Sequence, residues 1–121
     1  MNKRKRNPNA ISFGAATEIL SKLKSDSIPV TVWHVFPSAE CRLHGFVYGD
    51  SKYVLLVRTS VNDDSGPFMN SVLARKGVRC VHYRVRSESK VFRGLGEDVL
   101  AFIFGVSSYV RVFYNATLLQ H

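Results

Sequence analysis

Two cysteines and two histidines have the residue types of a zinc site. Cys41 and His44 are separated by two residues, and Cys80 and His82 are separated by one. Four thiolate and imidazole ligands are usual for structural zinc. On a strand, however, Cys41 and His44 would point to opposite faces, because side chains alternate along an extended chain. The spacing therefore favours packed or hydrogen-bonded side chains over a metal site, and we expect neither a metal nor another cofactor.

Catalytic motifs are absent from the sequence. It contains no Gly-Xaa-Ser-Xaa-Gly elbow, no phosphate-binding glycine loop before a helix and no His-Glu-Xaa-Xaa-His pattern. Asp63 and Asp64 are adjacent carboxylates, but they stand in a run of turn-forming residues that ends at Gly66 and Pro67. The sequence therefore predicts a protein that is not an enzyme.

The lysines and arginines are concentrated in two segments. Lys3–Arg6 holds four of the 17, and residues 75–93 hold seven, with a single acidic residue among them. If this second segment is extended, His82, Arg84 and Arg86 share one face. Such a cationic ribbon can follow a nucleic-acid backbone, and nearby tyrosines can stack on unpaired bases. The pattern predicts a polyanionic partner, and the alternative is a solvated face of a basic protein.

Hydrophobic spacing predicts one short helix followed by strands. Apolar residues recur three and four positions apart at Ala16, Ile19, Leu20 and Leu23. This stripe predicts a helix over residues 14–25, capped by Ser12 and ended before Pro29. Runs of β-branched and aromatic residues then predict strands at 30–36, 41–48, 52–61, 68–74, 78–86, 99–104 and 109–118. Seven strands with turn signals between them favour a small antiparallel barrel or a sandwich.

The composition is that of one folded domain. The chain has 121 residues, 45% of them hydrophobic, which is enough for a core. We expect residues 1–10 to form a disordered basic arm and residues 11–121 to form a single domain. The net charge of +8 and the pI near 9.9 favour a polyanionic partner.

The apolar runs bear on the location of the protein. None approaches the ~18 residues of a membrane-spanning helix, so we expect no membrane partner. No apolar stretch of a secretory signal follows the basic start of the chain. We therefore expect a cytoplasmic protein with reduced cysteines, or a nuclear one if the source is eukaryotic or viral.

Several segments between the helix and the Arg-rich region occur in a recognisable order. The passage from Ile19 to Trp33 leads into Leu43–Gly45, and Asp50–Val54 follows. Residues 72–81 then place an arginine and a glycine around a turn between two short strands. This order resembles the Sm, Lsm and Hfq family over about residues 15–83, and residues 84–121 would form a C-terminal strand extension.

The resemblance implies a fold, an assembly and a partner. The fold would be mainly β, with a short N-terminal helix, a small, strongly bent antiparallel barrel of the Sm or SH3 type, and extra C-terminal strands. The protein would form a homo-oligomeric ring that binds single-stranded RNA. Family RNA contacts fall on Asp50 and Tyr53 in one loop, and on Arg75 and Gly77 in the other. Gly45 in a strand interior fits the sharp bend that such a barrel needs.

Basic residues beside these loops and along the Arg-rich strand complete the candidate nucleic-acid site. They are Lys52, Lys76, Arg79, His82, Arg84 and Arg86.

Two other functions fit the same sequence. A basic arm, an eighth strand at residues 89–95 and the terminal strand from Tyr109 to Tyr114 would suit a structural or assembly protein. A small viral coat protein, whose arm neutralises packaged nucleic acid, is an example. A protein-interaction barrel with unrelated positive charge is the third possibility.

Overall fold

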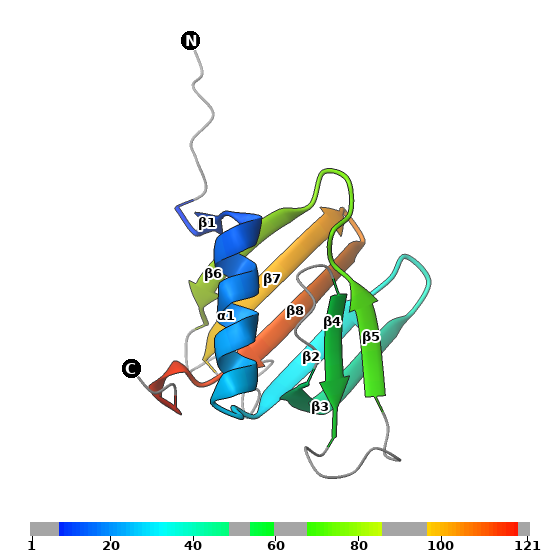
Figure 1. Ribbon diagram of the computed structural model, residues 1–121. Helices are drawn as coiled ribbons and strands as arrows, with labels where there is room; N and C mark the ends of the chain where they lie inside the picture. The colour runs from blue at the N-terminus through cyan, green and yellow to red at the C-terminus, as the bar shows by residue number, and fades with distance from the viewer. Residues whose placement is uncertain (1–7, 49–53, 60–67, 86–96, 119–121) are drawn as a thin grey trace.

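The protein is described here by a computed structural model that covers residues 8–48, 54–59, 68–85 and 97–118. In these ranges the chain forms one α-helix and eight strands of a single antiparallel sheet (Figure 1). The helix is α1 (Phe13–Ser25), and a short 3-10 turn, η1 (Ala116–Leu118), follows the last strand. The strands are β1 (Ala10–Ile11), β2 (Val30–Val35), β3 (Glu40–Val47), β4 (Val54–Arg58), β5 (Phe68–Val72), β6 (Arg79–Arg84), β7 (Asp98–Gly105) and β8 (Ser108–Tyr114). The predicted mainly β fold with a short N-terminal helix is confirmed.

Helix α1 forms where the apolar stripe predicts it. The Ser12 hydroxyl accepts a hydrogen bond of 3.0 Å from the Ala15 backbone N–H, which satisfies one of the free donors of the first turn. The buried side chains of α1 are Ala16, Leu20 and Leu23. They lie along one face of the helix, so the stripe seen in the sequence is the face that packs on the sheet.

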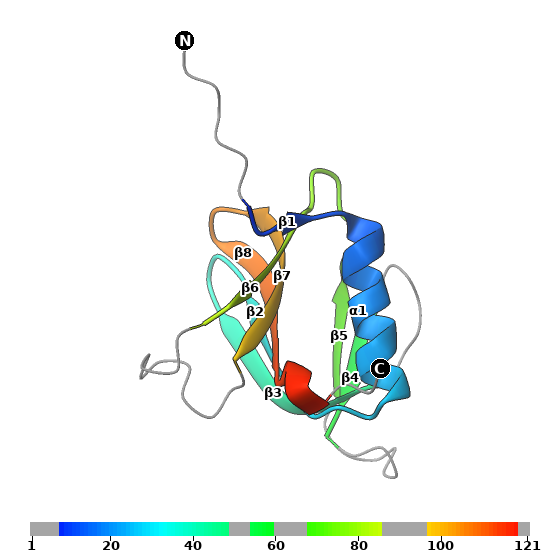
Figure 2. The same cartoon turned by 90° about the vertical axis from the view of Figure 1, so that its left-hand side faces the viewer.

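The sheet curves around the core but does not close. Its order is β1-β6-β7-β8-β2-β3-β4-β5, so β1 and β5 are its two edges in the described part of the chain. Figure 2 shows β4 and β5 across the core from β6, β7 and β8, with α1 beside them. A closed barrel of the Sm or SH3 type is therefore not confirmed. The physical reason is that β7 and β8 stand between β6 and β2, so that among the described residues no strand ladder joins β1 to β5.

The last two strands occupy the middle of the sheet. β8 pairs with β2 from Thr31 opposite Phe113 to Val35 opposite Tyr109, and β7 lies between β8 and β6. The expected C-terminal strand extension is therefore central to the fold, because it joins β6 to β2. The eighth strand expected at residues 89–95 lies outside the described residues.

Glycine 45 permits the close approach of β3 to β4. A Cβ atom at Gly45 would lie 1.9 Å from the backbone oxygen of Arg58 and 2.6 Å from its carbonyl carbon. Since backbone atoms cannot move aside as a flexible side chain can, only glycine fits here. The prediction of a special backbone position at Gly45 agrees with this contact.

The N-terminal end of the described chain is held by β6. Ala10 and Ile11 pair with Val81 and Cys80, and the His82 backbone N–H donates a 2.8 Å hydrogen bond to the Asn9 carbonyl. The last residues of the expected disordered arm are therefore part of the sheet. The cationic run Lys3–Arg6 lies outside the described residues.

The core lies between α1 and the concave face of the sheet. Large, fully buried side chains come from β7 and β8, among them Leu100, Phe102, Val110 and Val112. Because side chains alternate along a strand, the remaining residues of these strands point away from α1. We call that side of β6, β7, β8, β2 and β3 the outer face.

Candidate nucleic-acid interface

Strand β6 divides its residues between the two faces of the sheet. Cys80 is buried in the core, and His82 and Arg84 follow it on the same side. Arg79 and Tyr83 alternate with them and line a groove on the outer face. The prediction that His82 and Arg84 share one face of an extended segment therefore agrees with the structure. Arg86 lies outside the described residues.

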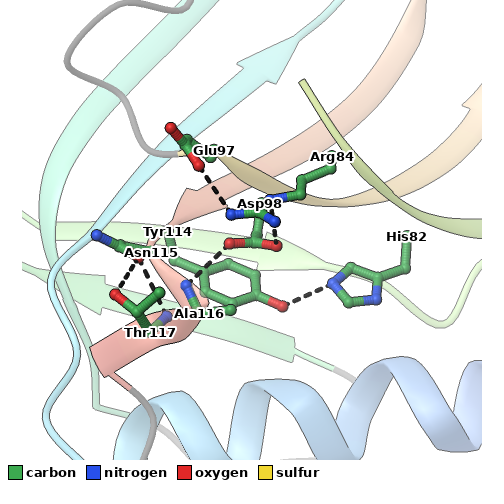
Figure 3. A network of polar contacts seen from close by, with 8 residues as sticks. All are labelled: His82, Arg84, Glu97, Asp98, Tyr114, Asn115, Ala116 and Thr117. Atoms are coloured by element: carbon green, nitrogen blue, oxygen red, sulfur yellow. Dashed lines mark hydrogen bonds and ion pairs between the residues drawn. The ribbon is translucent and has the colours of Figure 1, made fainter. Parts of the chain in front are cut away.

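His82 and Arg84 are engaged in a polar network at one end of β6 (Figure 3). His82 Nε2 lies 2.7 Å from the hydroxyl of Tyr114. Arg84 donates to Glu97 at 2.9 Å and lies 4.0 Å from a carboxylate oxygen of Asp98. The polar atoms of His82 and Arg84 therefore already have partners on β7, on β8 and in the residue before β7. RNA contact by these two residues stays a prediction.

The same network holds the 3-10 turn η1 that follows β8. Asp98 accepts a 2.9 Å hydrogen bond from the Ala116 backbone N–H, and Asn115 accepts bonds from the Thr117 backbone and hydroxyl. Burial and the Asp98 charge raise the pKa of Tyr114 to about 12. Tyr114 is therefore neutral at ordinary pH. The cluster has a structural role, because it joins β6 to β8 and β7 to η1.

The predicted turn between two short strands is present between β5 and β6. The Val78 N–H donates to the Arg75 carbonyl at 3.1 Å, and Gly77 has a φ of +76°, which glycine adopts without strain. Lys76 is exposed in this turn. Arg75 lies 4.6 Å from the centroid of the Phe104 ring. The other loop contacts implied by the family resemblance lie outside the described residues; they are Asp50, Lys52 and Tyr53.

A groove of about 270 Å³ on the outer face brings together two arginines and two tyrosines. Arg79 and Tyr83 come from β6, and Tyr109 and Arg111 come from β8. Between them runs β7, which contributes Ala101, Ile103 and Gly105 to the lining. Ala101 and Gly105 are small, so β7 leaves a hollow that the arginines and tyrosines of β6 and β8 flank.

Strand register explains why these residues meet. Arg79 is opposite Ile103, which is opposite Tyr109 on β8. Two residues further along the same strands, Ala101 lies opposite Arg111. Directly opposed residues of antiparallel strands share a face, and strands lie about 4.8 Å apart. Arg79 and Tyr109 are thus two strand spacings apart, on opposite sides of the same hollow.

The groove is positively charged. Among the described residues, neither Arg79 nor Arg111 forms a salt bridge. Arg111 lies 4.6 Å from the centroid of the Tyr109 ring, a cation–π contact that leaves its charge unneutralised. Arg79 and Arg111 are thus available to an anion, in contrast to Arg84 on the other side of the sheet.

Sequence reasoning placed Arg79 in the site and missed Tyr109 and Arg111. The signal for these two was their alternation with Val110 and Val112, which puts both polar residues on one face of a strand. Nothing local indicates that β8 lies two strands from β6. That pairing brings Arg111 and Arg79 to one groove.

A buried serine–histidine pair lies on the inner face, away from this groove. His34 Nδ1 is 2.9 Å from the Ser71 hydroxyl, and the two residues are 5% and 1% exposed. The His34 ring stacks on Phe36 at 4.0 Å. Burial, and secondarily the charge of Arg75, lowers the pKa of His34. The pair tethers β2 to β5 across the core.

The four zinc-type residues do not meet. Cys41 is exposed on β3, whereas Cys80 is buried on β6, and three strands lie between β3 and β6 in the sheet. His44 Nδ1 lies 2.7 Å from the Thr31 hydroxyl, and His82 contacts Tyr114. In the described ranges no three His, Cys, Asp or Glu residues are grouped to hold a metal ion.

Comparison with known proteins yields no relative: no family model, curated protein or solved structure matches the chain. No described helix is long and apolar enough to span a bilayer. The outer-face groove is the feature of the described chain that best indicates a function.

Proposed function

We propose that this protein binds single-stranded RNA in the outer-face groove. The observation that carries the proposal is the grouping of Arg79 and Arg111, which lack acidic partners in the described chain, with Tyr83 and Tyr109. Arginine binds phosphate through charge-assisted hydrogen bonds, and tyrosine rings stack on unpaired bases. The groove thus offers both kinds of contact that a single strand requires.

The hollow itself favours an unpaired base over a duplex. Its volume of about 270 Å³ lies between strands, with Ala101 and Ile103 as apolar lining. Bases in a duplex are stacked on their neighbours and cannot present a face to a tyrosine. A base of a single strand can enter the hollow while its phosphate contacts an arginine at the side.

The Sm-like relationship stays a prediction, as do assembly into a homo-oligomer and a cytoplasmic location. The proposed groove differs from the loops to which the resemblance assigns RNA contacts, because Arg75 and Gly77 lie in the β5–β6 turn. RNA binding by the outer face depends on neither a ring nor the family.

The test compares three arginine variants in a binding titration. Fluorescence anisotropy of a labelled 12-nucleotide oligouridine gives Kd for the wild type and for Arg79→Ala, Arg111→Ala and Arg84→Ala. We expect Kd to rise about tenfold for each groove variant, since losing one charged hydrogen bond removes roughly 1.5 kcal/mol of binding free energy. Arg84→Ala is the matched control from the same strand and should change Kd little.

Two further measurements sharpen this test. The slope of log Kd against log salt should fall by about 0.7 for each phosphate contact removed. A duplex of the same length and a deoxy-oligonucleotide of the same sequence show whether the protein prefers a single strand and RNA. Equal Kd values for the wild type and both groove variants would contradict the proposal.

A further inference from the structure

The row of residues that includes Arg111 continues beyond the groove onto β2 and β3. Arg111 lies directly opposite Trp33 on β2, and Trp33 lies directly opposite Arg42 on β3. The three side chains therefore share the outer face. At about 4.8 Å between strands, the row extends roughly 10 Å from Arg111 to Arg42.

This row presents a stacked arginine–aromatic pair beside the one in the groove. The Arg42 guanidinium lies 4.4 Å from the centroid of the Trp33 ring, and Arg42 is exposed. The corresponding pair in the groove is Arg111 over Tyr109, at 4.6 Å. A guanidinium plane held on a ring can stack with a base and attract a phosphate at the same time.

Glu40 fixes the indole and limits the positive surface. The Trp33 Nε1–H donates a 2.7 Å hydrogen bond to a Glu40 carboxylate oxygen, so the ring is held in place. Glu40 lies opposite Val35 in the next row along the strands. The negative charge of Glu40 disfavours a phosphate in that row. An anionic ligand that leaves the groove is therefore favoured along the row of Arg111, Trp33 and Arg42.

We infer that bound RNA runs across the strands, from the groove past Arg111 to a second base-stacking position on Arg42 and Trp33. This inference rests on the proposed function and adds the course and length of the bound strand. From Arg79 on β6 to Arg42 on β3 there are four strand spacings, or about 19 Å. At about 3.4 Å per stacked nucleotide, this distance corresponds to at most about six nucleotides.

Trp33 provides a direct readout because it is the single tryptophan of the chain. Oligouridines of two and eight nucleotides are titrated against the full-length protein, with tryptophan emission and anisotropy recorded in parallel. The octamer should change the emission with the same Kd that anisotropy gives. The dinucleotide should bind in the groove and leave the emission unchanged. The 12-nucleotide oligouridine should bind about as tightly as the octamer, because the track holds at most about six nucleotides.

Arginine variants locate the second position. Arg42→Ala should weaken octamer binding about tenfold and leave dinucleotide binding unchanged, because only the longer strand reaches β3. The matched control is Arg84→Ala, which removes an arginine paired with Glu97 on the other side of the sheet and should leave both Kd values unchanged.

The outcomes separate the inference from the proposed function. If the octamer binds and Arg79→Ala weakens it, but emission and the Arg42→Ala variant show no effect, the track across β2 and β3 is overturned and groove binding stands. If neither oligonucleotide binds, the proposed function fails and the track fails with it.

Discussion

At the scale of single residues, position on a strand decides what a charge can do. Arg79 and Arg84 are both on β6, but they are five positions apart and point to opposite faces. Arg84 forms a salt bridge of 2.9 Å with Glu97, whereas Arg79 forms no salt bridge in the described chain. Counting cations in a segment therefore overestimates the charge offered to a ligand, because part of it is neutralised within the fold.

A substitution at Gly45 tests the close approach of β3 and β4. Gly45→Ala should lower the free energy of unfolding by about 3 kcal/mol or prevent folding, because its Cβ would overlap the Arg58 backbone. Gly105→Ala is the control, since nothing lies within 4 Å of a Cβ there. Urea denaturation followed by circular dichroism measures both. Equal stability of the two variants would show that β3 and β4 can separate at little cost.

The buried His34 makes stability depend on pH. Its pKa is lowered by burial and by Arg75, so the unfolded chain binds a proton more readily than the folded chain. The free energy of unfolding should therefore fall as pH drops through the unfolded histidine pKa of about 6.5, by at most about 1.4 kcal/mol per pH unit. Urea denaturation at pH 7.5 and pH 5.5 should show a smaller loss in His34→Gln. An equal loss in both proteins would assign the effect to other groups.

At the scale of elements, the β7–β8 hairpin joins the two halves of the sheet. It supplies Leu100, Phe102, Val110 and Val112 to the core and stands between β6 and β2. It also supplies Tyr109 and Arg111 to the groove. Folding and the proposed binding site therefore depend on the same hairpin.

Truncation tests this role of the hairpin. A chain that ends at residue 85 retains the whole segment that resembles the Sm family, but it should not fold. Strand β6 loses its pairing with β7, and the core loses Leu100, Phe102, Val110 and Val112. Thermal unfolding followed by circular dichroism should show no cooperative transition, in contrast to a chain that begins at residue 8 and continues to residue 121. A cooperative transition in the shorter chain would indicate that the Sm-like segment folds by itself.

At the scale of the whole molecule, the positive charge is distributed between a folded surface and the first residues. The net charge of +8 includes four cations in Lys3–Arg6, ahead of the described chain. Any such run attracts polyanions without specificity, and its contribution falls steeply with salt. RNA binding through the groove must therefore be separated from binding through this run.

Deleting residues 1–7 separates these contributions. The deletion stops there because Asn9 and Ala10 contact β6 and belong to the fold. We expect the truncated protein to bind oligouridine at 150 mM salt, with a smaller salt slope and with the same loss on Arg79→Ala as in the full chain. Loss of all binding on truncation would favour the coat-protein alternative, in which the arm carries the interaction.

The sequence by itself determined the local structure. The helix, the positions of β2 to β8 and the alternation on β6 follow from the spacing of apolar residues within each segment, since each element buries one face. The Ser12 cap and the special position of Gly45 are also local, and both were predicted.

Only the tertiary structure decided which strands are neighbours. That choice placed β7 and β8 between β6 and β2, matched Arg84 with Glu97, and brought Arg79 to the groove that contains Arg111. Pairing of strands far apart in the sequence depends on how all the apolar faces are buried together, and no single segment contains that information. Only part of the candidate site could therefore be predicted from the sequence. Arg79 lies in the basic segment of residues 75–93, whereas Tyr109 and Arg111 lie on β8, whose neighbours only the folded sheet defines.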